Sequence, residues 1–346
     1  MKDFFQMDTG EHRLSLLAQA RQVALFALQQ YDLAWERIQF IQLSDTITYK
    51  IETSTAEKYL LRIHSDRWSK DEIRSELMML QAFRHGAGIT VPEGLASRDG
   101  SCVLEVDTEE GYRRPFVTMM RWLEGEVIEG EMTEECSYNM GVLVGKLHEA
   151  AAQFKPPSHF VRPTWGIESF RRELARLEKY YPIFLSEEAW KAYQAAADKI
   201  IYSLALIPKN KDTYGLIHAD LHTGNIVFQD DTPFPIDFGR CGYGYHLYDI
   251  AGTILGLYPK HREIFIQGYQ RVRTLEAEYV QQLECFFVMN MIENYCHHAS
   301  DPREISSLIA EQPYAQAIIR DFLKGAPFVF QVIESMEIDW QVNESQ

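Results

Sequence analysis

Two spacings of apolar residues follow one another in the N-terminal part of the chain, and each predicts a different element. Residues 12–30 carry apolar side chains at intervals of three and four, which predicts a leading amphipathic helix. We assign to its buried face Leu14, Leu17, Ala18, Leu25 and Leu28. Within 46–52 the interval falls to two, and the segments 38–43 and 59–63 are equally rich in strand-forming residues. We therefore expect a small antiparallel sheet after the helix.

A second helix is predicted to start after Ser69. Ser69 and Glu72 stand three apart, as in a capping box, and an apolar stripe that includes Ile73, Leu77 and Leu80 follows. Two more strand-like segments, 101–106 and 116–122, come after it. The region from about 35 to 121 is therefore expected to consist of strands and one helix.

The pattern changes after Gly125. Residues 133–154 predict a helix with Met140, Leu143, Val144 and Leu147 on one stripe, and 167–206 and 262–335 also have largely helical patterns. We expect an α+β protein with two parts, residues 1–123 and 124–346, the second being larger and mainly helical.

Composition and charge narrow the range of functions. Of the 346 residues, 46% are apolar and 24% charged, which excludes a disordered chain. The net charge of −16 disfavours nucleic acid and anionic membranes as partners, and would suit a cationic ligand if it gathered in a cleft. Five scattered cysteines, no signal-peptide pattern and no long apolar run lead us to expect a cytoplasmic protein.

The chemistry is concentrated in residues 216–239, LIHADLHTGNIVFQDDTPFPIDFG. His218, Asp220 and Asn225 stand in the order and spacing of a kinase catalytic loop, and Asp237 begins an Asp-Phe-Gly triplet. Two short strand-like runs separate the two groups. A hairpin formed by these runs would bring Asp237 back beside Asn225 and Asp220.

These residue types suit phosphoryl transfer. Mg²⁺ prefers oxygen ligands, which the carboxylate of Asp237 and the amide of Asn225 supply. The carboxylate of Asp220, not itself a metal ligand, is placed to accept a hydrogen bond from an attacking hydroxyl. His218 is then a residue that braces the backbone. The motif therefore predicts an enzyme that uses ATP and Mg²⁺.

The sequence HADLHTGNIVF, followed by PIDFG and YDIAG, resembles the aminoglycoside phosphotransferase and choline kinase family, the small-molecule branch of the protein-kinase-like fold. The resemblance implies a bilobal fold in which a nucleotide-binding lobe, with a small antiparallel sheet and one main helix, precedes a larger helical lobe with the catalytic loops and the acceptor site. It implies that Asp220 is the catalytic base, that Asn225 and Asp237 bind Mg²⁺, and that Asp249 is a structural carboxylate.

The same resemblance assigns residues in the first lobe. Arg62 stands on a predicted strand where the family more often has lysine, and would clamp the ATP phosphates with Glu76 as its partner. The expected phosphate loop, 43–46, contains no glycine, so the hydroxyl of Ser44 would replace backbone contacts. Backbone groups of Arg121 and Leu123 would pair with adenine.

The phosphate acceptor is open at this stage. The acidic balance favours a small amine-bearing hydroxyl compound of the aminoglycoside, choline or homoserine type, and segment 61–69 also resembles bacterial homoserine-kinase-like and stress-response Ser/Thr kinases. The aromatic residues that would cage a quaternary amine, or more simply pack the lobe, are Trp165, Tyr243, Tyr245 and Tyr248. We favour packing.

Two alternatives remain. One is a Ser/Thr protein kinase of the same fold, against which stands the short distance of twelve residues between Asp237 and Asp249. The other is a pseudokinase that binds nucleotide without turnover, suggested by Arg62 and the glycine-free loop. The intact Asp220, Asn225 and Asp237 argue against it. The oligomeric state is open.

Overall fold

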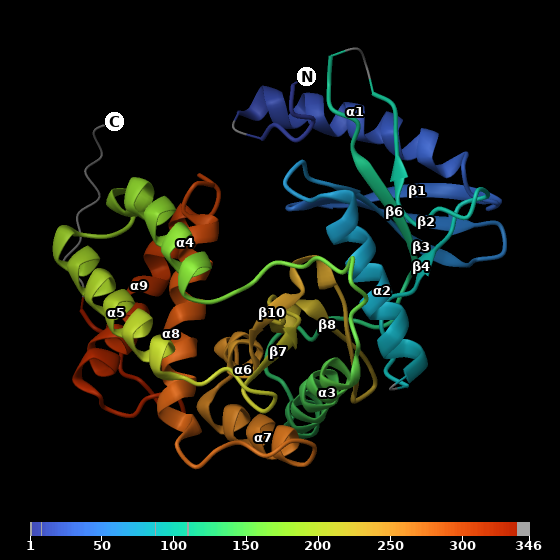
Figure 1. Cartoon of the computed structure of the whole chain (residues 1–346). Helices are drawn as coiled ribbons and strands as arrows, with labels where there is room; N and C mark the ends of the chain where they lie inside the picture. The colour runs from blue at the N-terminus through green and yellow to red at the C-terminus, as the bar shows by residue number, and fades with distance from the viewer. Residues whose placement is uncertain (1, 8, 87, 109–110, 338–346) are drawn as a thin grey trace. The chain divides into compact units, whose positions relative to one another are not determined.

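The alternating segments near the start of the chain form one antiparallel sheet in the computed structural model, which describes residues 2–7, 9–86, 88–108 and 111–337 (Figure 1). The strands lie in the order β1-β2-β3-β6-β4, and β5 also pairs with β6. Their bounds are β1 (Trp35–Leu43), β2 (Thr46–Thr53), β3 (Lys58–His64), β4 (Gly94–Leu95), β5 (Leu104–Glu105) and β6 (Phe116–Arg121). The sheet belongs to a first unit that runs to Glu124 and also includes Phe154–Arg162.

The two faces of this sheet differ in character. Leu61 and Ile63 of β3 lie in an apolar core shared with the leading helix α1 (Gly10–Leu28). Because side chains alternate along a strand, Arg62 lies on the opposite face, where it contacts the helix α2 (Lys70–Gly86). The sheet face that packs against α2 therefore carries a charged side chain, whereas the face that packs against α1 is apolar.

The predicted buried face of α1 is correct only in part. Leu28 is buried and Leu17 packs against the core, as predicted. Leu14 is 72% exposed and Ala18 is exposed, whereas the side chains facing the core are Leu16, Ala20, Val23, Ala24, Ala27 and Leu28. Half of these are alanines, which let the helix axis approach the sheet closely. A count of large apolar residues does not detect a face made of small ones.

The capping box that starts α2 is confirmed. The Ser69 Oγ accepts a hydrogen bond from the Glu72 N–H at 3.2 Å, and the Glu72 carboxylate accepts one from the Ser69 N–H at 2.9 Å. The strand predicted over 101–106 is shorter, because the chain still turns and bends over 97–103. Asp99 accepts hydrogen bonds from the Ser97 hydroxyl and the Ser101 N–H, and the Ser101 hydroxyl donates to the carbonyl of residue 103.

The second unit comprises Gly125–Gln153 and the chain from Pro163 onward, and is mainly helical. Its helices are α3 (Glu134–Gln153), α4 (Ile167–Tyr180), α5 (Glu187–Leu206), α6 (His246–Leu255), α7 (Pro259–Gln270), α8 (Tyr279–His298) and α9 (Ile305–Lys324), with short helices η1 (Tyr181–Ile183), η2 (Thr223–Asn225) and η3 (Phe238–Arg240). Its strands are β7 (Tyr214–Ile217), β8 (Ile226–Gln229), β9 (Thr232–Pro235) and β10 (Gly242–Tyr245).

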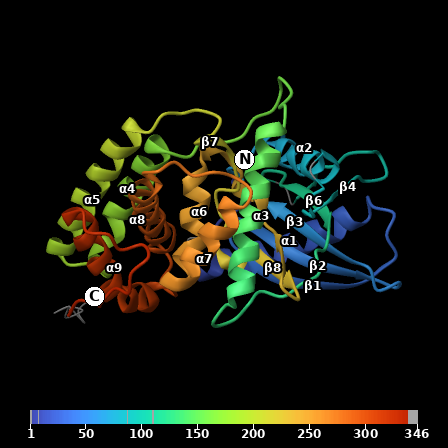
Figure 2. The ribbon, with the colours of Figure 1, turned by 90° about the horizontal axis from the view of Figure 1, so that it is seen from below.

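Helix α8 is largely buried and packs against α4, α5, α6 and α9. Figure 2 shows α6 and α7 between α8 and α3. α3 and α7 approach closely because Gly141 and Gly268 face backbone carbonyls of the partner helix, where any side chain would clash. The helical run predicted to 335 ends at Lys324, since Gly325 adopts a left-handed φ of 70°. The sheet-containing first unit and the helical second unit confirm the predicted α+β class.

Candidate active site

The loop after β7 contains Asp220 and ends in η2 with Asn225. The Asn225 side-chain nitrogen donates to the Asp220 carbonyl oxygen at 2.8 Å and lies 3.4 Å from its carboxylate Oδ2. Asp220 is partly exposed and Asn225 is buried. The amide of Asn225 therefore fixes the backbone of Asp220 and keeps the two side chains in contact.

The hairpin of β8 and β9 returns the chain to the same place. At its open end the Ile236 N–H donates to the Asn225 carbonyl at 2.9 Å, and Asp237 follows directly. Asp237 caps η3 in a left-handed conformation, with φ 59° and ψ 63°, and its Oδ1 accepts a hydrogen bond from the Gly239 N–H. As expected from the sequence, Asp237 lies beside the segment that carries Asn225 and Asp220.

His218 connects the catalytic loop to the loop after β9. Its Nε2 donates to the Ile236 carbonyl at 2.9 Å, and its ring packs at 4.4 Å against Phe238. A carbonyl oxygen can only accept a hydrogen bond, so Nε2 carries the proton in this tautomer. His218 thus braces the two loops, the role expected for it.

Asp249, on the first turn of α6, holds the start of the catalytic loop. Its two carboxylate oxygens accept hydrogen bonds from the backbone N–H groups of His218 and Ala219, each at 2.7 Å. Ala219 has a φ of 63°, a left-handed conformation that costs a residue with a side chain of order 1 kcal/mol or more. The two hydrogen bonds maintain this strained turn immediately before Asp220.

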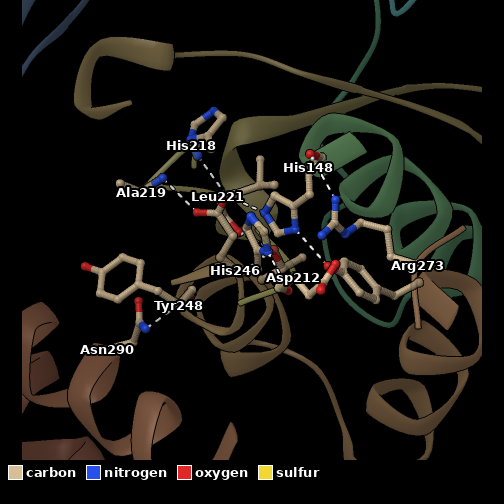
Figure 3. Close-up of polar contacts among 12 residues, drawn as sticks. His148, Asp212, His218, Ala219, Leu221, His246, Tyr248, Arg273 and Asn290 are labelled. Atoms are coloured by element: carbon tan, nitrogen blue, oxygen red, sulfur yellow. Dashed lines mark hydrogen bonds and ion pairs between the residues drawn. The ribbon is translucent and has the colours of Figure 1, made fainter. Parts of the chain in front are cut away.

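A buried network supports Asp249 from α3 (Figure 3). The His148 Nε2 lies 3.1 Å from the Asp249 carboxylate, and its Nδ1 lies 3.0 Å from the Tyr269 hydroxyl. Burial raises the pKa of Asp249, but the hydrogen bonds from His148 and the His218 N–H outweigh it and hold the pKa below its usual value. Asp249 therefore stays ionised although it is only 1% exposed.

The histidines of this network are neutral. Burial lowers the pKa of His148 below its ordinary value. His246 stacks on His148 with ring centroids 4.6 Å apart, and its Nδ1 donates to the Asp212 carbonyl at 3.0 Å. Burial, and next the proximity of His148, lower the pKa of His246 to about 3.

In the first unit, Arg62 of β3 and Glu76 of α2 form a buried bidentate ion pair, with N–O distances of 2.8 and 2.9 Å. They are 3% and 1% exposed. Burial raises the pKa of Glu76, but the charge of Arg62 and its hydrogen bonds outweigh burial and lower the pKa. His64, on the same sheet face, has its pKa lowered to about 3 by burial and then by Arg62.

The glycine-free turn between β1 and β2 has its own charge compensation. Ser44 is exposed, and its N–H donates to the Thr46 carbonyl at 3.0 Å. Asp45, an unexpected residue for a phosphate loop, forms an ion pair with Arg67. The turn therefore brings a guanidinium group to the side chain that would otherwise repel a phosphate.

Arg121 ends β6, and Leu123 follows it in the chain. The Arg121 N–H donates to the Glu93 carbonyl at 2.8 Å, so a contact of its backbone with a base would come from its carbonyl oxygen. Its side chain lies over the ring of Tyr59 and pairs with Glu93. Leu123 is partly buried.

Comparison with known proteins decides the family. The sequence model of the phosphotransferase enzyme family matches residues 38–280, about 70% of the chain. The chain belongs to the phosphotransferase enzyme family. It is therefore an enzyme that transfers phosphoryl groups, with the protein-kinase-like fold that the sequence resemblance implied.

Two curated proteins are similar over much of this phosphotransferase. It is 29% identical over 324 residues to the amicoumacin kinase of Bacillus subtilis. This alignment covers 88% of this chain and 93% of that protein. It is also 29% identical over 241 residues to an uncharacterized protein of Synechocystis, of whose length the match spans 64%.

Solved structures share its fold. A microcompartment-associated aminopropanol kinase superposes with a TM-score of 0.79 at 24% identity, covering 89% of this chain and 99% of that one. An amicoumacin kinase in complex with AMP-PNP, Ca²⁺ and Ami gives a TM-score of 0.73 at 20% identity, over 91% and 96% of the two chains.

The described residues contain no group of three His, Cys, Asp or Glu side chains arranged to hold a metal ion. A kinase-type Mg²⁺ site does not require one, because it takes one or two protein oxygens and the rest from phosphates and water. Within the same residues, no helix combines the length and apolar character needed to cross a membrane.

The aromatic residues of this phosphotransferase pack its second unit, as favoured from the sequence. Tyr245 is buried and donates to the Ile207 carbonyl at 3.1 Å, and Tyr248 is buried with its hydroxyl on Glu293. Trp165 already has a cation on its ring, because the Arg240 guanidinium lies 4.5 Å from its centroid.

Two groups of the second unit were not predicted from the sequence. The contact of His148 with Asp249 joins residues 101 positions apart, which no local pattern indicates. Glu293 does have a local signal, because this carboxylate directly follows the largely apolar run 285–292. Such a residue in a largely buried helix needs a partner, and the partner is Tyr248.

Proposed function

We propose that this phosphotransferase moves the γ-phosphate of ATP to a hydroxyl of a small, amine-bearing molecule. The observation that carries the proposal is the β8–β9 hairpin, which brings Asp237 beside the segment of Asn225 and Asp220. The family supports the reaction class, and the names of the amicoumacin and aminopropanol kinases support a small hydroxyl acceptor with an amine.

Asn225 and Asp237 fit a Mg²⁺ ion. The Asn225 amide nitrogen is used by the Asp220 carbonyl, which leaves the amide Oδ1 as its ligating atom, and Asp237 offers carboxylate oxygens. Both are the hard oxygen donors that Mg²⁺ prefers. When bound, the ion would neutralise charge on the ATP phosphates.

Asp220 acts as the base in this proposal. Its carboxylate would accept a hydrogen bond, and then the proton, from the acceptor hydroxyl as the oxygen attacks the γ-phosphorus. The left-handed turn at Ala219, fixed by Asp249, orients it. Such positioning is the main contribution that a protein makes to a loose phosphoryl-transfer transition state.

The first unit is proposed to bind the nucleotide. Arg62, aligned by Glu76, would contact phosphate oxygens, and the exposed Ser44 would donate a hydroxyl to them. The carbonyl of Arg121 and the backbone of Leu123 would pair with adenine. The second unit would then supply the catalytic loops and the acceptor site. We propose a cytoplasmic location, in keeping with its five scattered cysteines.

The test is ADP release from Mg-ATP with a panel of acceptors: aminoglycosides, choline, ethanolamine, homoserine, 1-amino-2-propanol and a generic protein. We expect one class of small acceptor to stimulate release, and Asp220→Ala to reduce turnover by about 10²–10⁴-fold with nucleotide binding nearly intact. Asp237→Ala should abolish turnover and also weaken Mg-ATP binding.

Other results select other functions. Stimulation by the protein substrate alone would identify a protein kinase, and nucleotide binding with no release for any acceptor would favour a pseudokinase. Equal loss of Mg-ATP binding in the two variants would contradict the separate roles of Asp220 and Asp237.

A further inference from the structure

Glu293 is a buried carboxylate with little to stabilise its charge. It lies on α8, is 8% exposed, and accepts a hydrogen bond through Oε2 from the Tyr248 hydroxyl. Among the described residues, no hydrogen bond reaches its Oε1. Glu284 of the same helix differs, because its Oε1 accepts the N–H groups of Phe328 and Val329. Glu284 therefore has a structural role, whereas the Oε1 atom of Glu293 can accept a hydrogen bond from a ligand.

A short chain of contacts links Glu293 to the catalytic loop. Its partner Tyr248 directly precedes Asp249, whose carboxylate binds the N–H of Ala219, and the next residue is Asp220. Burial and then the charge of Glu293 raise the pKa of the Tyr248 hydroxyl, and the nearby charge of Asp220 adds to the rise. Figure 3 shows the Tyr248 ring extending away from the His148 network.

The charges around Glu293 favour a cation. Burial raises the pKa of Glu293 to about 7, the Tyr248 hydroxyl and the charge of Arg240 oppose that rise, and Glu173 of α4 adds to it. The Arg240 guanidinium also stacks on the ring of Trp165. Asp220 also lies near Tyr248. Glu293, Glu173 and Asp220 therefore oppose the single positive charge of Arg240.

We propose that Glu293, oriented by Tyr248, binds the ammonium group of the phosphate acceptor and selects amino alcohols over neutral alcohols. The inference rests on the proposed function and adds the residue that recognises the amine. The carboxylate of Glu293 accepts one hydrogen bond, from the neutral Tyr248 hydroxyl. An ammonium group bound at Oε1 would add a second hydrogen bond and a positive charge. Because the site is largely desolvated, such a charge pair is stronger than it would be in water.

The pairing should depend on pH. The groups that face Glu293 are Tyr248 of α6, Arg240 of η3 and Glu173 of α4, with Cys296 on its own helix. The ammonium binds the ionised carboxylate, so affinity for an amine should rise from pH 6 to pH 8 as Glu293 loses its proton.

The experiment compares matched ligands by saturation-transfer NMR on the full chain. The pairs are 1-amino-2-propanol with 1,2-propanediol, choline with 3,3-dimethylbutan-1-ol, and kanamycin with its N-acetylated form. The variants are Glu293→Gln, Tyr248→Phe and, as a control, Glu278→Gln, which makes the same change at an exposed position where α8 begins. Circular dichroism melting checks that each variant is folded.

We expect the wild type and Glu278→Gln to bind the amine of at least one pair about tenfold or more tightly than its neutral partner. Glu293→Gln should lose that preference and its pH dependence, and Tyr248→Phe should weaken it. The proposal is overturned if Glu293→Gln keeps the preference, or if the wild type shows none in any pair.

Binding separates this inference from the proposed function. If the amine preference depends on Glu293 but no acceptor stimulates ADP release, the amine site stands and the proposed reaction fails. If acceptors are phosphorylated and Glu293→Gln leaves the amine preference unchanged, the reaction stands and the amine site fails.

Discussion

The orientation of Asp220 depends on the backbone conformation of one residue, Ala219. Ala219 is strained, and Asp249 keeps it in this conformation by accepting hydrogen bonds from the N–H groups of His218 and Ala219. This conformation orients the next residue, Asp220. Asp249 is in turn fixed by a neutral His148. The proposed catalytic residue, on a partly exposed loop, is thus positioned by a carboxylate in the core.

Asp249→Asn should lower both stability and turnover. An amide has one acceptor oxygen, so one of the two backbone N–H groups loses its partner at a cost of about 1–3 kcal/mol. We expect the free energy of unfolding to fall by that amount and kcat by at least about 10²-fold, with KM for ATP little changed. Asp198→Asn, at an exposed position of α5, is the control. An unchanged kcat in folded Asp249→Asn protein would contradict the positioning role.

The buried histidines should make the protein sensitive to acid. A histidine whose pKa is lowered on folding binds fewer protons in the native state than in the unfolded state, so stability falls as the pH drops below about 6.5. His246 and His64 contribute in this way down to about pH 3. Glu293, with a raised pKa, opposes the effect between about pH 4.5 and 7.

His246→Asn isolates one contribution, because asparagine preserves a donor toward the Asp212 carbonyl. Below pH 6 the free energy of unfolding of the variant should fall less steeply than that of the wild type, by about 1.4 kcal/mol per pH unit. Urea unfolding at intervals between pH 4.5 and 7.5 measures both slopes. Parallel curves would show that His246 is protonated in the folded protein.

At the scale of elements, the ion pair of Arg62 and Glu76 joins β3 to α2 and has two separable effects. Glu76→Gln leaves Arg62 buried with an impaired partner and should cost about 3–5 kcal/mol of stability. The double variant Arg62→Met, Glu76→Leu replaces the pair by apolar groups of similar size and should regain most of that loss.

The same double variant tests the proposed contact with phosphate. Mg-ATP binding, measured by titration calorimetry, should remain at least about tenfold weaker than in the wild type even where stability has recovered. Wild-type affinity in the double variant would mean that Arg62 serves the fold alone.

Elements were predictable where their determinants are local. The capping box of α2 involves residues three apart, and the β8–β9 hairpin joins neighbouring strands, so short stretches of sequence specify both. The buried face of α1 depended on how closely its alanines approach the sheet. The contact of Tyr248 with Glu293 spans 45 residues and depends on how α6 packs against α8, which no local pattern reports.

At the scale of the whole molecule, the chain passes between its two units three times, because Phe154–Arg162 belongs to the first unit although α3 precedes it. Within that segment the Val161 N–H donates to the Ser75 hydroxyl at 2.9 Å. Arg162 donates to the Glu72 carbonyl and covers the ring of Trp68. The segment therefore supports the start of α2.

Arg162→Ala should weaken the first unit selectively. Loss of a buried hydrogen bond to a carbonyl and of cation–π contact with Trp68 should cost about 1–3 kcal/mol. Hydrogen exchange should accelerate in α2 and leave α8 unchanged, and Arg171→Ala, at an exposed position of α4, should alter neither. Equal acceleration in both helices would mean that the two units unfold together.

The route of the chain also orders events during synthesis. When the ribosome has just added Glu124, every strand of the first sheet has been made. The segment Phe154–Arg162, which supports α2, has not. About 38 further residues separate Glu124 from Arg162, which at roughly 5–20 residues per second takes about two to eight seconds. During this interval the indole of Trp68 has the guanidinium of Arg67 on its ring but lacks that of Arg162. The start of α2 therefore lacks its hydrogen bonds with this segment until Arg162 has been made.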